Sequence, residues 1–239
     1  MLILNHLTGF GVGGGPSAAS IVFIARTTDT VNATTFTFTG ASLGSAAERT
    51  GILVGVHGQA GALRTWDSMT VAGNAATRLE SVNSAVGNPD AGAIFFIANS
   101  SLPLGTETSG NIVVTGSGAF DHCTISVFTL HNTATSAYST VKNQASGLVA
   151  SNSIDCPAGG VIMSIGHTSA AAADPTSMAI TNGTERYDVV PESGGRLVVA
   201  GASDAYATVQ TGLTITYTGT SGGSSQSTSM IATSFAAAA

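Results

Sequence analysis

The chain has 239 residues and a formal net charge of −6, and only 8% of its residues are charged, against about 25% in an ordinary soluble domain. With 7 basic residues it lacks the basic stripe of a nucleic-acid-binding protein, and it has no uninterrupted apolar stretch near the roughly 20 residues that cross a membrane. We therefore expect no nucleic-acid partner and no membrane insertion. The 28 Ser, 32 Thr and 30 Gly favour a β-rich protein over a helical bundle.

The N-terminal segment combines an apolar stretch, residues 1–7, with a glycine-rich stretch, residues 9–16. It has no basic region of the kind that starts a secretory signal, so we do not expect one. Two interpretations are open: an arm on a flexible hinge that docks on another subunit, or an edge strand followed by a loop. The residues expected to make the arm's assembly contacts are Met1, Leu2, Ile3, Leu4, Leu7 and Phe10.

From residue 21 onward, short β-branched runs alternate with turn residues, which is typical of β-strands. In residues 35–39, Thr and Phe alternate strictly, so that Phe36 and Phe38 share one face. Residues 69–77 predict a hairpin with its turn at Gly73 and Asn74. The other predicted strands are 21–25, 52–57, 93–98, 111–115, 124–130, 148–154, 161–167, 178–181, 185–190, 197–200, 213–217 and 229–235.

This spacing predicts an all-β fold, an antiparallel β-sandwich or jelly roll, rather than alternating β and α units. Residues 42–50, 135–146 and 170–173 are the only segments with room for a helical turn. We predict an arm and hinge over 1–16 and a single β-sandwich domain over 17–239. If there are two domains, the break lies near 132–146, where the periodicity lapses.

Motifs associated with catalysis occur without the context that they need. Ser42 lies in a G-x-S-x-G pattern after a predicted strand, but too few residues follow for the helix of a nucleophile elbow. Residues 9–14 match G-x-G-x-x-G but are followed by Pro16 and a strand, so we expect no dinucleotide or other cofactor. The five histidines are scattered at spacings that do not suit a metal. We therefore predict no catalytic, cofactor or metal site, and no enzyme.

Trp66 is the one candidate for an aromatic platform that binds a ligand, and its alternative role is to close one end of the core. A carbohydrate-binding module would need Trp66, Tyr138, Tyr187 and Tyr206 to converge on one face. Cys123 and Cys156 fit no metal or redox spacing. They are expected to be small buried residues, with a disulfide as the alternative.

The order of these segments resembles that of small β-rich virion proteins of tailed bacteriophages. The alternating Thr-Phe strand leads into residues 40–49 and the apolar run 52–56, and segments 69–77, 110–115, 123–130, 157–161 and 202–207 follow in that order. The resemblance spans roughly residues 8–235. It contains no motif of functional residues that could be carried over to this chain.

The resemblance implies a non-enzymatic structural protein of the virion, assembled in the cytoplasm of the bacterial host. A tail-fibre, tail-tip or other surface appendage is the first expectation, and a head decoration or head-spike protein is the alternative. The implied partners are further copies of the chain and other virion proteins, with a host surface receptor or glycan as a further partner. A carbohydrate-binding module and a hydrolase that uses Ser42 remain as alternatives from other classes.

Overall fold

The computed structural model describes residues 18–84, 89–170, 175–191, 196–220 and 226–239. The arm and hinge predicted over 1–16 therefore lie outside the described residues. Strands joined by short connections make up most of the described chain, and its only helical element is the single 3-10 turn η1 (Asn99–Ser101). This confirms the predicted all-β fold class. Within the described ranges, no helix is long and apolar enough to cross a membrane.

An eight-stranded antiparallel sheet contains the first half of the described chain, in the order β1-β8-β3-β6-β5-β4-β7-β2. The sheet curls until its two outermost strands, β1 and β2, lie next to each other, so it approaches a closed barrel. Its strands are β1 (Ser20–Asp29), β2 (Ala33–Ser42), β3 (Arg49–Gln59), β4 (Trp66–Val71), β5 (Asn74–Ser84), β6 (Asp90–Ala98), β7 (Ser109–Phe120) and β8 (His122–His131).

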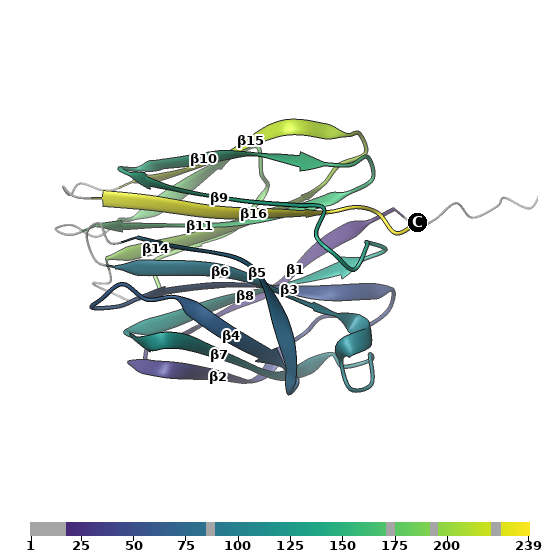
Figure 1. Ribbon diagram of the computed structural model, residues 1–239, viewed down its shortest axis with the longest axis horizontal. Coiled ribbons are helices and arrows are strands. Elements are labelled where there is room, and N and C mark those ends of the chain that lie inside the picture. The colour runs from purple at the N-terminus through teal and green to yellow at the C-terminus, as the bar shows by residue number, and fades with distance from the viewer. Residues whose placement is uncertain (1–17, 85–88, 171–174, 192–195, 221–225) are drawn as a thin grey trace, which may run out of the picture.

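The second half forms two smaller antiparallel sheets: a five-stranded sheet that packs on the first sheet, and a three-stranded sheet that packs on the far side of the five-stranded one (Figure 1). The five-stranded sheet has the order β13-β14-β11-β16-β9, and the three-stranded sheet has the order β10-β15-β12. Their strands are β9 (Ser139–Ser146), β10 (Val149–Cys156), β11 (Val161–Ala170), β12 (Ser177–Thr181), β13 (Glu185–Val189), β14 (Leu197–Ala205), β15 (Gln210–Thr220) and β16 (Gln226–Phe235).

Three buried clusters follow from this stacking. The first fills the curled eight-stranded sheet and includes Phe36, Phe38 and Trp66. The second lies between the eight-stranded and five-stranded sheets. The third lies between the five-stranded and three-stranded sheets and includes Tyr217. Because successive side chains of a strand point to opposite faces, β11 contributes Met163 to the second cluster and its neighbours to the third. The five-stranded sheet is therefore buried on both faces.

Of the three segments with room for a helical turn, two hold none, and most of the third, 170–173, lies outside the described residues. The segment 135–146 holds no helical turn, because β9 runs through it and pairs with β16. The loop between β2 and β3 holds no helical turn either. The hairpin of β4 and β5 turns one residue earlier than predicted, at Ala72 and Gly73, since Val71 pairs with Asn74. Both turn residues have positive φ angles, 49° and 83°, as a two-residue type I′ turn requires.

Candidate functional site

Trp66 does not form a ligand platform. Its side chain is fully buried at the start of β4, and its indole Nε1–H donates a hydrogen bond to the Ala91 carbonyl at 3.2 Å. The ring stacks on Phe120 with centroids 3.8 Å apart, and the edge of Phe36 lies against it. The structure thus favours the core role that the sequence left open for this residue.

The four aromatic side chains required for a carbohydrate-binding face do not converge. Trp66 belongs to the first core cluster and Tyr187 to the second, and both are buried. Tyr138 is 60% exposed, whereas Tyr206 is half-buried beside the third cluster. These four residues therefore do not meet the condition that a carbohydrate-binding module would need.

Ser42 is exposed at the end of β2, where it pairs with Ser109 of β7. No helix follows it before β3, and two of the five histidines, His131 and His167, are hydrogen bonded elsewhere. His131 bonds to the Thr129 hydroxyl and the Ala47 carbonyl, and His167 bonds to Asp90. These contacts give Ser42 neither a base nor the elbow geometry that activates a serine nucleophile.

Within the described residues, no group of three or more His, Cys, Asp or Glu side chains could hold a metal ion. The two cysteines are free thiols in different core clusters, Cys123 in the first and Cys156 in the third. Burial raises the pKa of Cys156 to about 11 and raises that of Cys123 well above its usual value, with a smaller contribution from Asp29. Both are therefore small buried residues, as expected, and not reactive thiols.

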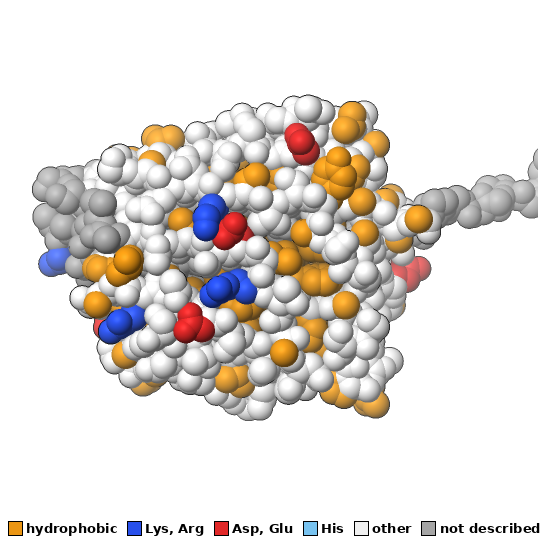
Figure 2. Space-filling view, viewed as in Figure 1, with side chains coloured by type: hydrophobic (Ala, Val, Ile, Leu, Met, Phe, Trp, Pro, Cys, Tyr) orange, Lys and Arg blue, Asp and Glu red, His pale blue; other side chains and the backbone are white. Residues whose placement is uncertain are grey.

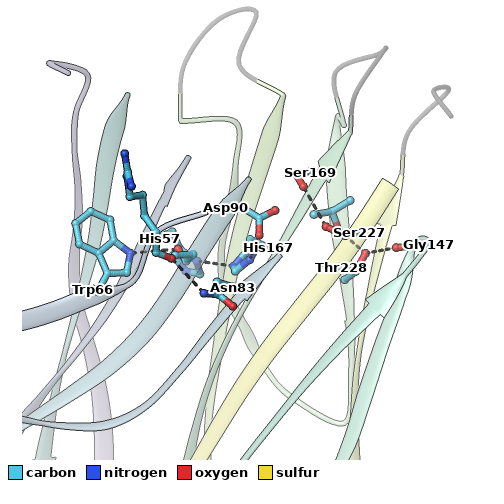
Figure 3. A network of polar contacts seen from close by, with 12 residues as sticks. His57, Trp66, Asn83, Asp90, Gly147, His167, Ser169, Ser227 and Thr228 are labelled. Carbon is cyan, nitrogen blue, oxygen red and sulfur yellow. Dashed lines mark hydrogen bonds and ion pairs between the residues drawn. The ribbon is translucent and has the colours of Figure 1, made fainter. Parts of the chain in front are cut away.

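A buried polar cluster, which we call the histidine relay, lies between the eight-stranded and five-stranded sheets. Its five members are His57 on β3, Asp90 on β6, Ser126 on β8, His167 on β11 and Tyr187 on β13. His57, Asp90, Ser126 and His167 are each at most 1% exposed, and Tyr187 is 7% exposed. In Figure 3 the two histidines lie close together and Asp90 lies beside His167.

The distances in the histidine relay form one continuous chain. Asp90 Oδ1 lies 2.9 Å from His167 Nε2, and His167 Nδ1 lies 3.4 Å from His57 Nδ1. His57 Nε2 lies 3.3 Å from the Tyr187 hydroxyl, which donates to Ser126 Oγ at 3.0 Å. Burial, and then the nearby His167 and His122, lower the pKa of His57 well below its usual value of 6.5. His57 is therefore neutral at physiological pH.

Two glycines leave room for this cluster. A Cβ atom at Gly92 would lie 3.1 Å from His167 Cε1, and one at Gly55 would lie 2.6 Å from Ser126 Oγ. The positions of the two histidines in the sequence carry one signal that these side chains share a core. His57 follows Leu53 at an even spacing, and His167 follows Met163 in the same way, so both histidines lie on the strand faces that line the second cluster.

Buried hydroxyl groups are also paired, mainly between β11 and β16. The hydroxyl oxygens of Thr168 and Thr228 lie 2.9 Å apart. Those of Ser169 and Ser227 lie 3.2 Å apart (Figure 3). Thr228 also donates to the Gly147 carbonyl at 2.9 Å. These pairs show how a chain rich in Ser and Thr can bury them, since buried polar groups are tolerated when they are hydrogen bonded.

A solvent-open groove of about 320 Å³ lies beside β5 and β6 and the segment that precedes β9. Leu79, Phe96, Ala98 and Ala137 supply apolar lining, and Thr77 and Ser136 supply hydroxyls. Figure 2 shows hydrophobic side chains gathered around a hollow on this face, with positively and negatively charged side chains beside them. The ion pair of Lys142 with Glu80 at 2.9 Å spans the same face and joins β9 to β5. We call this hollow the β5 groove.

No protein-family model matches the chain, and no curated protein matches it either.

Proposed function

We propose that this chain is a non-enzymatic structural protein of a tailed-bacteriophage virion, assembled in the host cytoplasm and built into a tail fibre, tail tip or similar surface appendage. The proposal rests on the resemblance in segment order described above. The observation in the structure that supports an assembly role is the β5 groove, an exposed hollow with apolar side chains among its lining residues. Exposed apolar hollows on soluble proteins are typical sites of contact with another chain.

The proposed partners are further copies of the chain and other virion proteins, with a host receptor or glycan at the exposed end of an appendage. The apolar side chains of Met1, Leu2, Ile3, Leu4 and Leu7 supply the proposed assembly contact. Full burial of one large aliphatic side chain is worth roughly 1.5–3 kcal/mol. Four or five of them would therefore offset much of the roughly 4–15 kcal/mol entropy cost of association.

Removal of residues 1–15 tests the assembly contact. We expect the truncated chain to keep the melting temperature of the full chain and to lose its oligomers in light scattering after size exclusion. The matched control keeps the full length and replaces Thr8, a polar residue of the same segment, with Ser. Unfolding of the truncated chain would mean that the segment is a core strand. Unchanged assembly would place the contact elsewhere on the surface.

The virion assignment is tested on phage particles produced by a host that encodes the chain. We expect mass spectrometry of purified particles to detect the chain, and antibody labelling in electron micrographs to mark the tail. Labelling of the capsid would instead favour the head decoration or head-spike alternative. Absence of the chain from intact particles would overturn the proposal.

A further inference from the structure

The histidine relay crosses the boundary between two sheets. Three of its members, His57, Asp90 and Ser126, belong to the eight-stranded sheet, and His167 and Tyr187 belong to the five-stranded sheet. Each of its four contacts joins a residue of one sheet to a residue of the other: Asp90 to His167, His167 to His57, His57 to Tyr187, and Tyr187 to Ser126. The positions of the hydrogen atoms in this series of hydrogen bonds therefore affect how strongly the two sheets are joined.

The hydrogen bonds of Ser126 decide which atom is the donor and which the acceptor in each contact of the relay. The carbonyl of Gly55, 3.4 Å from Ser126 Oγ, can only accept, so the single hydroxyl hydrogen of Ser126 points to it. The Tyr187 hydroxyl donates its own single hydrogen to Ser126 Oγ. The Tyr187 oxygen therefore has only a lone pair left for His57, and His57 Nε2 must carry a hydrogen and donate it.

The same reasoning continues through the two imidazole rings. A neutral histidine carries one ring hydrogen, so His57 with a hydrogen on Nε2 has a bare Nδ1 that accepts. Its neighbour at 3.4 Å, His167 Nδ1, must then be the donor. His167 Nε2 and Asp90 Oδ1, 2.9 Å apart, share one further hydrogen. That pair thus holds one proton more than a carboxylate beside a neutral imidazole.

An additional proton has no suitable place in this arrangement. If it bound at His57 Nδ1, two N–H groups would face each other across 3.4 Å in a site without solvent. Such a contact replaces a hydrogen bond with a repulsion between positively charged rings, which is unfavourable in a medium of low polarity. The contact between His57 on β3 and His167 on β11 would be lost, and the contacts of His167 with Asp90 and of Tyr187 with Ser126 would be the polar links of the relay that remain between the sheets.

We propose that the histidine relay is a pH-sensitive latch between the eight-stranded and five-stranded sheets, closed near neutral pH and opened when His57 takes up a proton. The proposal does not depend on the virion assignment, since it rests on contacts within one chain.

Other titratable or charged groups of the described chain also face the relay. His122 on β8 lies close enough to His57 to disfavour its charged form, together with His167. Asp90 on β6 offsets the charge of His167. On the other side, Arg26 of β1 and the buried Tyr217 of β15 interact with Tyr187 electrostatically. None of these groups gives His57 a carboxylate partner of its own.

The sign of the pH dependence follows from the lowered pKa of His57. In the open or unfolded chain this histidine titrates near 6.5, and in the closed state well below that value. The free energy that favours the closed state over the open state is therefore greatest above pH 6.5, and it decreases as the pH falls toward the lowered pKa of His57. Over that window, one extra bound proton raises the equilibrium constant for opening about tenfold per pH unit.

Nitrogen-15 NMR of histidine-labelled wild-type protein tests the hydrogen arrangement without any substitution. At pH 7.5 we expect His57 to be neutral with its hydrogen on Nε2, and His167 to carry a hydrogen on Nδ1. A His57 ring with its hydrogen on Nδ1, or a charged His57 ring at this pH, would overturn the direction of the chain and with it the proposal.

The variant His57→Gln tests the latch itself, because an amide keeps one donor and one acceptor but takes up no proton. Hydrogen exchange of β3, β11 and β13, corrected for the intrinsic effect of pH, is compared at pH 7 and pH 5. In wild type we expect protection of these strands to fall by tenfold or more, and in His57→Gln by less than threefold. The matched control His131→Gln alters a histidine outside the relay and should behave as wild type. An equal loss of protection in His57→Gln and wild type, or no acid-dependent loss in wild type, would overturn the proposal.

Discussion

The indole of Trp66 lies face to face with the ring of Phe120, with 3.8 Å between centroids and 9° between planes. Gly58 on β3 makes this stack possible, because a Cβ there would lie 2.5 Å from Trp66 Cζ2 and 2.9 Å from Phe120 Cδ1. This small contact therefore joins β3, β4 and β7 across the inside of the curled sheet.

Gly58→Ala is expected to destabilise the protein by about 1–3 kcal/mol, because overpacking of a dense core forces neighbours from their positions. The matched control is Gly61→Ala, where a Cβ meets nothing within 4 Å. Trp66 is the chain's only tryptophan, so its fluorescence reports the unfolding transition directly. Equal denaturant midpoints for the two variants would show that the stack tolerates expansion.

The type I′ turn between β4 and β5 offers a stabilising change. Ala72 adopts a φ of 49°, a conformation that disfavours residues other than Gly, Asn and Asp by roughly 1–2 kcal/mol. We expect Ala72→Gly to gain stability, with a rise of a few degrees in melting temperature. Ala75→Gly, on the adjacent strand β5, should lower it instead, since Gly weakens a strand interior. A fall in both variants would argue against a type I′ turn.

Cys123 and Cys156 should be unreactive in the folded protein. Their thiol pKa values are raised, that of Cys156 to about 11, and both side chains are fully buried. At pH 8 we expect no reaction with a thiol reagent such as Ellman's until denaturant is added, and then two thiols per chain. Fewer than two thiols in the denatured, unreduced protein would indicate a disulfide.

The ion pair of Lys142 and Glu80 should contribute little to stability. Burial of Glu80 favours its neutral form, but the hydrogen bonds from Lys142 and the Ser81 N–H and the nearby charges of Lys142 and Arg78 outweigh that effect and lower its pKa. The contribution is therefore present above the usual Glu pKa of 4.5 and is lost as the pH falls through the lowered value. Because the side chains are 49% and 30% exposed, we expect Lys142→Ala to lose less than about 1 kcal/mol.

Salt provides the check on that expectation. The difference in melting temperature between Lys142→Ala and wild type should shrink in 1 M NaCl, whereas Lys142→Arg should match wild type at both salt concentrations. A difference in melting temperature that is the same at both salt concentrations would show that packing of the lysine stem, and not its charge, stabilises the protein.

The strands were predictable because their side chains alternate or form continuous apolar runs. Phe36 and Phe38 lie in one core as their spacing indicated. β9 was missed because it is an outermost strand of its sheet, with polar residues at most positions and only Val141 and Ala145 packed against the third cluster. Such a strand is specified by its pairing with β16, and no local pattern reveals that pairing.

The histidine relay shows a different limit. The strand pattern placed His57 and His167 within predicted strands, but their contact depends on which sheet faces which. They lie 110 residues apart in the sequence, and Asp90 and Tyr187 reach them from two further strands. The arrangement of three stacked sheets decides these contacts, and turn spacing alone contains no information about it.

The burial of β11 on both sides has a consequence for insertions and deletions. Every residue from Val161 to Ala170 is buried, with alternate side chains committed to different neighbouring sheets. Loss of one residue near the middle would turn all subsequent side chains to the opposite face, so that His167 would point at Tyr217 and its neighbour Thr168 at Asp90. Insertions and deletions within this strand should therefore destabilise the protein far more than substitutions that preserve side-chain size.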